Sequence, residues 1–263
     1  MISILNQNLY MKFYKIALLL FLISFSSCKN DKLQLQKIEG KQIPISDNIQ
    51  ARTDIEDFIK PYRRHVNAEL DSVLAYSKKT YSKMDGELNT AIGNLFADII
   101  LEQANPVFKA RTGKNIDMVL VNHGGIRSII SKGDITIRTA YQLMPFENSI
   151  VVVGLKGTSI KKLLKYLTAA KRAHPISGLT LVVDNNFNVK KALIGGKEIE
   201  NNKTYYVATN DYLYNGGDSM TFFKPNEGLE ILNYKIRNAL LDYFKKTDTI
   251  NPVIDNRFIQ IKK

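Results

Sequence analysis

Three short stretches of the sequence hold side chains that could line a ligand pocket. The first, VLVNHGGIRS, runs from a strand-like segment into Asn122, two glycines and Arg127. Arginine offers a planar set of donors for phosphate or vicinal oxygens, and asparagine offers both a donor and an acceptor. Gly124 and Gly125 permit positive φ angles and close approach to the main chain. The spacing also fits an ordinary turn whose arginine is a solvated surface charge.

The other two stretches, taken alone, are weaker evidence for a ligand pocket. YQLMPFENS places Phe146 in a connection ahead of a predicted strand, where an aromatic ring is more often an anchor for the core or loop than a ligand contact. VATNDYLYNGGDSMTFF places Tyr212 in front of the turn sequence Asn215-Gly216-Gly217-Asp218. Its local pattern favours a simple turn capped by the aspartate.

Length and composition indicate a globular protein with a strong positive charge. The 263 residues are 44% hydrophobic, which is enough for a proper core. Lysine and arginine exceed aspartate and glutamate by 37 − 25 = 12. Residues 1–27 hold two lysines and no acid, so removing them leaves a charge of +10. A basic field attracts many anions, but no zinc knuckle or helix-turn-helix pattern is present, and we expect no nucleic-acid partner.

The N-terminal segment predicts export. Lysines precede ten apolar or small residues, followed by Ser26, Ser27 and Cys28, and the run is too short for a stable transmembrane helix. Residues 1–27 are predicted to be a signal peptide, with translation starting at Met1 or Met11. Cys28 lies in a sequence that resembles a bacterial lipobox, which implies lipidation and an anchored lipoprotein facing the periplasm or the cell surface. A plain signal peptide with a chance cysteine is the alternative.

The remaining chain divides into a tether and one domain. Residues 28–51 are polar and aperiodic, whereas residues 52–263 show no break in composition. Apolar spacing predicts helices from Thr53 to Leu74, from Thr90 to a stop at Asn105-Pro106, from Thr158 to about Ala173, and from Leu229 to Phe244. Strands are expected at 117–122, 135–140, 149–155, 179–184, 189–194, 204–210 and in the terminal RFIQIKK. The mixture predicts an α+β fold.

The order and intervals of the three stretches resemble the C-terminal domain of the 5'-nucleotidase family. The matching segments are Asn122-His-Gly-Gly-Ile-Arg127, Pro145-Phe146, Leu155-Lys-Gly157, Tyr212-Leu-Tyr-Asn-Gly-Gly-Asp218 and the IGNLFADII segment from Ile92. The likeness covers residues 52 to the end. It implies a four-layer α/β/β/α sandwich that binds the nucleoside part of a substrate.

The resemblance also implies a role for each matching residue. Phe146 and Tyr212 would stack on the two faces of the base, and Asp218 would accept hydrogen bonds from ribose hydroxyls. Asn122 and Arg127 would reach the base edge, ribose or phosphate, and the glycine pairs would let the ligand lie close to the backbone. His123 is an exposed loop residue or a further anion contact.

Two departures from the family pattern limit what the chain is expected to do. Glu87, Leu88 and Asn89 stand where relatives commonly carry an arginine, so one anion contact is missing. The metallophosphatase motifs that hold two divalent metal ions are absent, and none of the three histidines lies in such a motif. No metal or cofactor is expected in this chain, and no catalytic residue.

Two functions follow from these expectations. The first is the substrate-recognising part of a split 5'-nucleotidase, with two metals on a separate metallophosphatase chain. The second is a non-catalytic lipoprotein that binds a nucleoside or nucleotide for uptake. A degenerate domain without a ligand is a third reading. The preferred base and the oligomeric state are not determined by the sequence.

Overall fold

The computed structural model of the chain describes residues 11, 13–21 and 35–261, which fall into two units, Met1–Arg52 and Thr53–Lys263. In the first unit, residues 13–21 are helical, and residues 35–52 contain a turn but no helix or strand. Cys28 lies outside the described residues. Within the described ranges, no helix combines the length and apolar character needed to cross a membrane.

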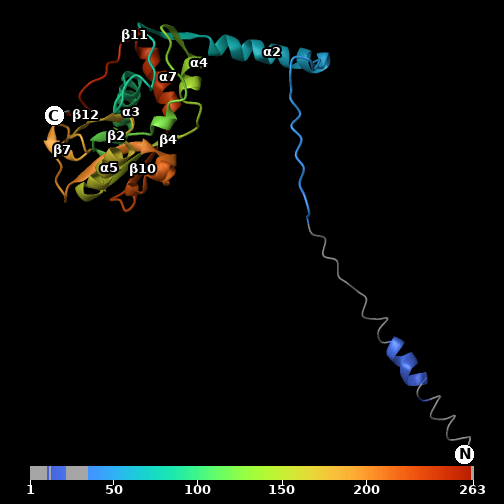
Figure 1. Cartoon of the computed structure of the whole chain (residues 1–263). Helices are drawn as coiled ribbons and strands as arrows, with labels where there is room; N and C mark the ends of the chain where they lie inside the picture. Colours follow the sequence, from blue (N-terminus) through green and yellow to red (C-terminus); the bar gives the residue numbers. More distant parts are fainter. Residues whose placement is uncertain (1–10, 12, 22–34, 262–263) are drawn as a thin grey trace, which may run out of the picture. The chain divides into compact units, whose positions relative to one another are not determined.

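The second unit is a mixed α/β domain (Figure 1). Its helices are α2 (Thr53–Leu70), α3 (Ala91–Thr112), α4 (Ile137–Leu143), α5 (Gly157–Ala170), α6 (Asp211–Tyr214) and α7 (Ile236–Lys246). Three 3-10 turns are η1 (His123–Gly125), η2 (Gly217–Ser219) and η3 (Thr221–Phe223). The expected α+β class is confirmed.

The strands found within residues 53–261 form three sheets. The five-stranded sheet has the order β10 (Leu229–Lys235), β4 (Ser149–Lys156), β9 (Thr204–Asn210), β2 (Met118–Leu120) and β5 (Ile176–Ser177). The four-stranded sheet has the order β12 (Phe258–Gln260), β6 (Leu179–Val183), β7 (Val189–Ile194) and β8 (Lys197–Glu198). The three-stranded sheet has the order β11 (Thr249–Ile250), β1 (Val73–Ser77) and β3 (Gly133–Thr136).

Part of the core lies between the five-stranded sheet and α3, and the rest includes residues of α5 and β6. Ile92, Phe96 and Ile100 recur every four residues along α3 and are almost fully buried. This spacing makes one apolar face, and α3 contacts every strand of the sheet and packs against α7. The interior strand β4 is buried from Ile150 to Leu155 because the sheet is covered on both faces there.

The strand directions bring four loops to one edge of the five-stranded sheet. β2 runs parallel to β9, so the segments that follow the two strands leave at the same end. β4 is antiparallel to β9, with Ile150 opposite Asn210, and β5 is antiparallel to β2, with Leu120 opposite Ile176. The segments that precede β4 and β5 therefore reach this edge as well.

The Gly-Asn-Leu segment at the start of α3 has a structural role. Asn94 donates from its amide to Asn89 Oδ1 at 2.9 Å and to the Val253 carbonyl at 3.0 Å. Asn89 in turn donates to the carbonyls of Asp255 and Phe258, at 3.1 and 3.0 Å. Both asparagines are buried. They bind the last segment of the chain to the N-terminal end of α3, because buried amides need partners.

The largest differences from the predicted boundaries occur at four elements. α2 ends at Leu70, and the apolar residues after it form β1. α3 continues through Pro106 to Thr112 and is capped by Gly113, whose φ of 72° suits glycine. The strand predicted at 135–140 ends at Thr136, which caps α4 through a capping box with Thr139. The last predicted helix begins only at Ile236, because Leu229–Lys235 pairs with β4.

α2 leaves its apolar side chains in solvent. Four of them, spaced three or four residues apart, are between 50% and 70% exposed: Ile55, Phe58, Tyr62 and Val66. No residue of α2 is buried. The helix is joined to α4 near its C-terminal end, where Arg138 donates to Asn67 at 3.1 Å and pairs with Asp71 at 2.7 Å.

Candidate functional site

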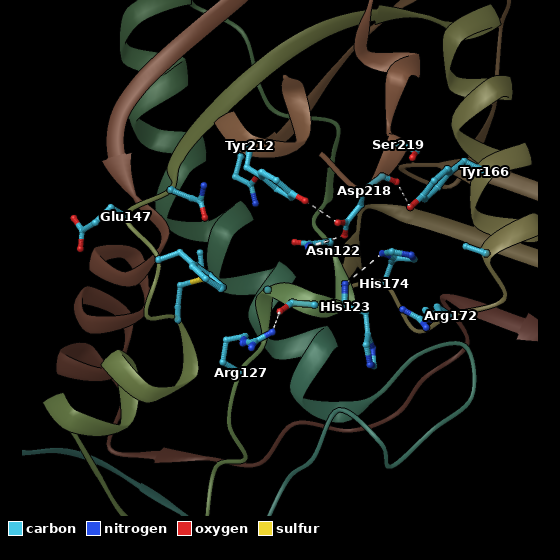
Figure 2. A pocket seen from close by; sticks show the side chains of 17 residues that line it. Asn122, His123, Arg127, Glu147, Tyr166, Arg172, His174, Tyr212, Asp218 and Ser219 are labelled. Atoms are coloured by element: carbon cyan, nitrogen blue, oxygen red, sulfur yellow. Dashed lines mark hydrogen bonds between the residues drawn. The ribbon is translucent and has the colours of Figure 1, made fainter. Parts of the chain in front are cut away.

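A cavity of about 1120 Å³ lies at the sheet edge where the four loops meet (Figure 2). Eight residues singled out in the sequence line it: Asn122, His123, Gly124, Gly125, Arg127, Phe146, Tyr212 and Asp218. Nine further residues complete its wall: Met144, Glu147, Asn148, Tyr166, Ala170, Arg172, His174, Asn210 and Ser219. Asn215, Gly216 and Gly217 do not line it.

The Asp218 carboxylate is held at the centre of the site by two side chains. Asn122 donates from Nδ2 to Oδ2 at 2.8 Å, and the Tyr212 hydroxyl donates to Oδ1 at 3.0 Å. Tyr166 of α5 donates to the main-chain oxygen of Asp218 at 2.9 Å (Figure 2). Each carboxylate oxygen has a second lone pair, so Asp218 can still accept hydrogen bonds from a ligand.

The glycines of the Asn-Gly-Gly-Asp stretch shape the turn beneath Tyr212. Gly216 has a φ of 94°, which only glycine adopts without strain. A Cβ on Gly217 would lie 2.4 Å from Cε1 of Tyr212, so the ring rests directly on this backbone. Asp218 and Ser219 have φ angles of 50° and 61°, in the left-handed region. The glycine pair thus positions the ring and the carboxylate without forming the cavity wall.

Gly124 and Gly125 do not use positive φ angles, contrary to the expectation from the sequence. Both lie in the 3-10 turn η1, and neither is among the residues with positive φ. A Cβ on Gly125 would lie 3.0 Å from Oδ1 of Asn122. The missing side chain therefore makes room for Asn122, whose amide is bonded to Asp218.

The two candidate stacking rings are exposed within the cavity. Phe146 is 41% exposed and Tyr212 is 48% exposed, so part of each ring is open to the cavity that both line. Phe146 precedes β4, and Tyr212 lies in the short helix α6 after β9. Antiparallel pairing of these strands brings both rings to the same cavity.

Arg237 of α7 fixes the segment that carries Phe146. It is 6% exposed, and Nη1 donates to the carbonyls of Met144, Pro145 and Phe146 at 3.3–3.5 Å. It also pairs with Glu147, as does Lys235. Hydrogen bonds from Lys235 and Arg237 lower the pKa of the Glu147 carboxyl to about 2. Arg237 could not be found from local sequence pattern because it lies 91 positions after Phe146.

Two histidines with defined hydrogen-bond roles form another part of the wall. His123 Nδ1 lies 3.2 Å from the Ala173 carbonyl, which can only accept, so this nitrogen carries the proton. The His123 backbone N–H donates to Nδ1 of His174 at 3.3 Å, so neutral His174 carries its proton on Nε2. Burial lowers the pKa of both rings, and that of His174 falls to about 4.

The segment 87–89 supplies no cation to the cavity. Leu88 is buried and Asn89 is bonded to the C-terminal segment. The positive side chains that line the cavity are Arg127 and Arg172, the latter just after α5. Within the described residues, no group of three or more His, Cys, Asp or Glu side chains is placed to hold a metal ion.

The profile of the family described as "5'-nucleotidase, C-terminal domain" matches residues 72–225. This chain belongs to that family. The description assigns the matched region to the C-terminal domain of 5'-nucleotidases.

The matched part of this chain covers less than half of each of two curated relatives. A 5'-nucleotidase-related protein of Glossina morsitans morsitans is 24% identical over 83% of this chain and 43% of its own length. The 5'-nucleotidase of Vibrio vulnificus is 24% identical over 84% of this chain and 39% of its own length. The chain therefore spans less than half the length of these relatives.

Solved structures of 5'-nucleotidases share the fold. The 5'-nucleotidase precursor from Thermus thermophilus has a TM-score of 0.66 at 24% identity, covering 78% of this chain and 43% of that one. The NAD nucleotidase of Haemophilus influenzae has a TM-score of 0.57 at 15% identity, covering 81% and 42%. The fold expected from the resemblance to the 5'-nucleotidase family is confirmed.

Acid should destabilise this domain through His174. Burial, reinforced by neighbouring His123, lowers the pKa of His174 from 6.5 to about 4. The unfolded chain then binds a proton near pH 6.5 that the folded chain does not bind until about pH 4. The free energy of unfolding therefore falls as the pH drops through this window. We expect a loss of about 2 kcal/mol between pH 6.5 and 4.5, measured by urea unfolding.

The matched variant is His174→Asn, because asparagine can still accept from the His123 N–H. In this variant the free energy of unfolding should change less with pH. The comparison is made above pH 4.5, the ordinary pKa of glutamate, because carboxylates gain protons below it. His123 contributes to the slope in the same direction and remains in the variant. His65→Asn, on the solvent-exposed helix α2, is the control. An unchanged slope in His174→Asn would contradict the assignment.

Proposed function

We propose that this domain recognises the nucleotide substrate of a split 5'-nucleotidase. The observation that carries the proposal is that two exposed rings and a held carboxylate face one cavity. Phe146 and Tyr212 can stack on a base, and Asp218 can accept hydrogen bonds from ribose hydroxyls. The membership of the family supports the same ligand class.

Tyrosine at position 212 gives this site a feature that phenylalanine would lack. Its hydroxyl donates to Asp218 while its ring rests on Gly217. The same side chain therefore presents an aromatic face and fixes the carboxylate. A ligand meets both groups already oriented, which lowers the entropy lost on binding.

Hydrolysis is assigned to a second chain. A metallophosphatase partner would supply two divalent metal ions, which activate water and stabilise the phosphoryl oxygens. The residues of the present cavity bind and orient the substrate, and Asn122 and Arg127 complete the set of polar contacts.

The exposed face of α2 is the proposed docking surface for that partner. Its four apolar side chains, Ile55, Phe58, Tyr62 and Val66, lie in solvent. A groove of about 930 Å³ continues from Val66 and Leu70 to Tyr141 and Pro145. Pro145 immediately precedes Phe146, so a partner seated here would border the nucleotide cavity. A contiguous exposed apolar surface of this kind is typical of a protein interface.

Removal of one stacking ring should weaken nucleotide binding. We expect Phe146→Ala to reduce the affinity for AMP by roughly 5- to 150-fold, because a base–aromatic stack contributes about 1–3 kcal/mol. Asp218→Ala should weaken both AMP and adenosine. Isothermal titration calorimetry measures each dissociation constant.

The control is Tyr76→Ala, which removes a ring that is also 41% exposed but lies on β1, outside the cavity. It should bind AMP like the wild type. If no nucleoside or nucleotide gives detectable heat with the wild-type protein, the proposed function is wrong and the ligand-free alternative is favoured.

A metallophosphatase chain should convert binding into turnover. We expect AMP hydrolysis to rise strongly when this protein is mixed with a co-transcribed metallophosphatase and a divalent metal. Phe58→Asp, on the apolar face of α2, should abolish the gain while leaving AMP binding intact. Asp57→Asn, an exposed change at the neighbouring position, is the control.

The outcome distinguishes the two candidate functions. Nucleotide binding without any gain from co-transcribed phosphatase chains would favour the binding lipoprotein that serves uptake. A gain that Phe58→Asp leaves unchanged would retain the split enzyme and move its interface away from α2.

We also propose that the protein is exported and anchored to a membrane by lipid on Cys28. The apolar run followed by Ser26, Ser27 and Cys28 supports this. In the source cells, labelled palmitate should be incorporated into the wild-type protein and not into Cys28→Ala. Labelling of both forms, or of neither, would contradict lipidation at this residue.

A further inference from the structure

A second hollow, a lysine-rich groove of about 580 Å³, lies between α5 and the hairpin of β7 and β8. Its walls carry two lysines from each side: Lys161 and Lys165 of α5, and Lys190 and Lys191 of β7. The described residues that line it include no arginine and one acid, Glu198. The groove is therefore positively charged on both walls.

Helix α5 separates this groove from the cavity at the sheet edge. Lys161 and Lys165 are four residues apart, so they lie on one face of the helix, and both line the groove. Tyr166 and Ala170 have the same spacing on another face, and both line the cavity. The two sites can therefore be altered separately by substitution.

The charge of the groove is largely available to a partner. All four lysines are exposed, and Lys190 pairs with Asp184 at 3.1 Å. Within residues 35–261, Lys161, Lys165 and Lys191 form no ion pair. Three of the four ammonium groups are thus free to interact with an anion outside the protein.

The segment that builds the groove also carries most of the net charge of the second unit. Residues 157–198, from the start of α5 to the end of β8, hold eight cationic and two acidic residues, a difference of 8 − 2 = 6. The whole of residues 53–263 holds 30 and 22, a difference of 30 − 22 = 8. The positive field of the unit is therefore concentrated in this segment.

Apolar side chains lie between the lysines. Val189 is 43% exposed, and Phe187 and Leu193 are half-buried in the groove wall. Lys171 Nζ lies 4.5 Å from the centre of the Phe187 ring, which adds a fifth lysine at this end. An apolar centre with a cationic rim suits a lipid surface, because lysine stems lie along apolar material while their ammonium groups reach phosphates.

We propose that this groove docks the domain on a membrane surface that contains anionic phospholipids. Charge complementarity favours that occupant. Arginine, whose planar fork matches a single carboxylate or phosphate, is absent from the described lining, whereas lysine presents a point charge on a flexible stem. Several flexible point charges suit many dispersed headgroups better than one fixed anion.

The segment before the domain is compatible with such docking. Residues 35–52 are exposed and contain no helix or strand, and they can span at most roughly 60 Å. A lipid anchor on the N-terminal side of this segment, as proposed above, would keep the groove near the membrane and raise its effective concentration there. Docking through lysines does not itself require the anchor.

The test is sedimentation of the unit Thr53–Lys263 with lipid vesicles. The hydrophobic core lies entirely inside this unit, so it can be assayed without the N-terminal segment, and circular dichroism checks its folding. At low salt it should sediment with vesicles of phosphatidylcholine mixed with phosphatidylglycerol and not with phosphatidylcholine alone. Added sodium chloride should release it, because salt screens exposed charges.

The double variant Lys165→Glu/Lys191→Glu should weaken binding to the anionic vesicles at least about tenfold, because each lysine near such a surface contributes to binding. The matched control is Lys78→Glu/Lys79→Glu, which makes the same change of charge at two exposed positions after β1. This control should bind like the wild type.

Equal binding of the wild type to both kinds of vesicle would overturn the proposal, as would equal weakening by the two double variants. Absence of binding to the anionic vesicles would also overturn it and would leave an acidic protein as the alternative occupant of the groove. None of these results depends on whether the cavity at the sheet edge binds a nucleotide.

Discussion

The parallel pairing of β2 with β9 is the constraint on which the site depends. Because both strands end at the same edge of the sheet, Asn122 and Asp218 can meet although they lie 96 positions apart. The antiparallel neighbours β4 and β5 bring the Phe146 loop and His174 to that edge from the opposite chain direction. A shift of one residue in the β2–β9 register would turn the side chains of the shifted strand to the other face.

Two side chains, Arg237 and Tyr166, hold the backbone of the site in place. Arg237 supports the Phe146 loop from α7, and Tyr166 supports the Asp218 turn from α5. Both act through main-chain carbonyls, so their effect depends on where the backbone lies rather than on which side chains the loops carry. The cavity wall is thereby tied to two helices of the domain, and a partner chain is not needed to assemble it.

Several strands could be predicted from local sequence pattern. The segments that form β4, β7 and β9 contain β-branched or aromatic residues and have turn sequences near them. The errors fell where two patterns compete: Leu229–Lys235 has apolar residues that suit either a helix or a strand, and its pairing with β4 decides. The motif residues could be chosen by spacing and resemblance. Arg172, His174 and Arg237 could not, because their roles arise only from tertiary contacts across the sheet edge.

The left-handed backbone at Asp218 and Ser219 lowers the stability of the fold, while Asp218 supplies the carboxylate proposed to bind the ligand. Two successive non-glycine residues in the left-handed region cost roughly 1–2 kcal/mol each. Glycine at position 218 would relieve part of that strain and would also delete the carboxylate that Asn122 and Tyr212 orient. Selection for thermal stability alone would therefore favour glycine at position 218. Retention of the aspartate under such selection would be a record of continued selection for the ligand.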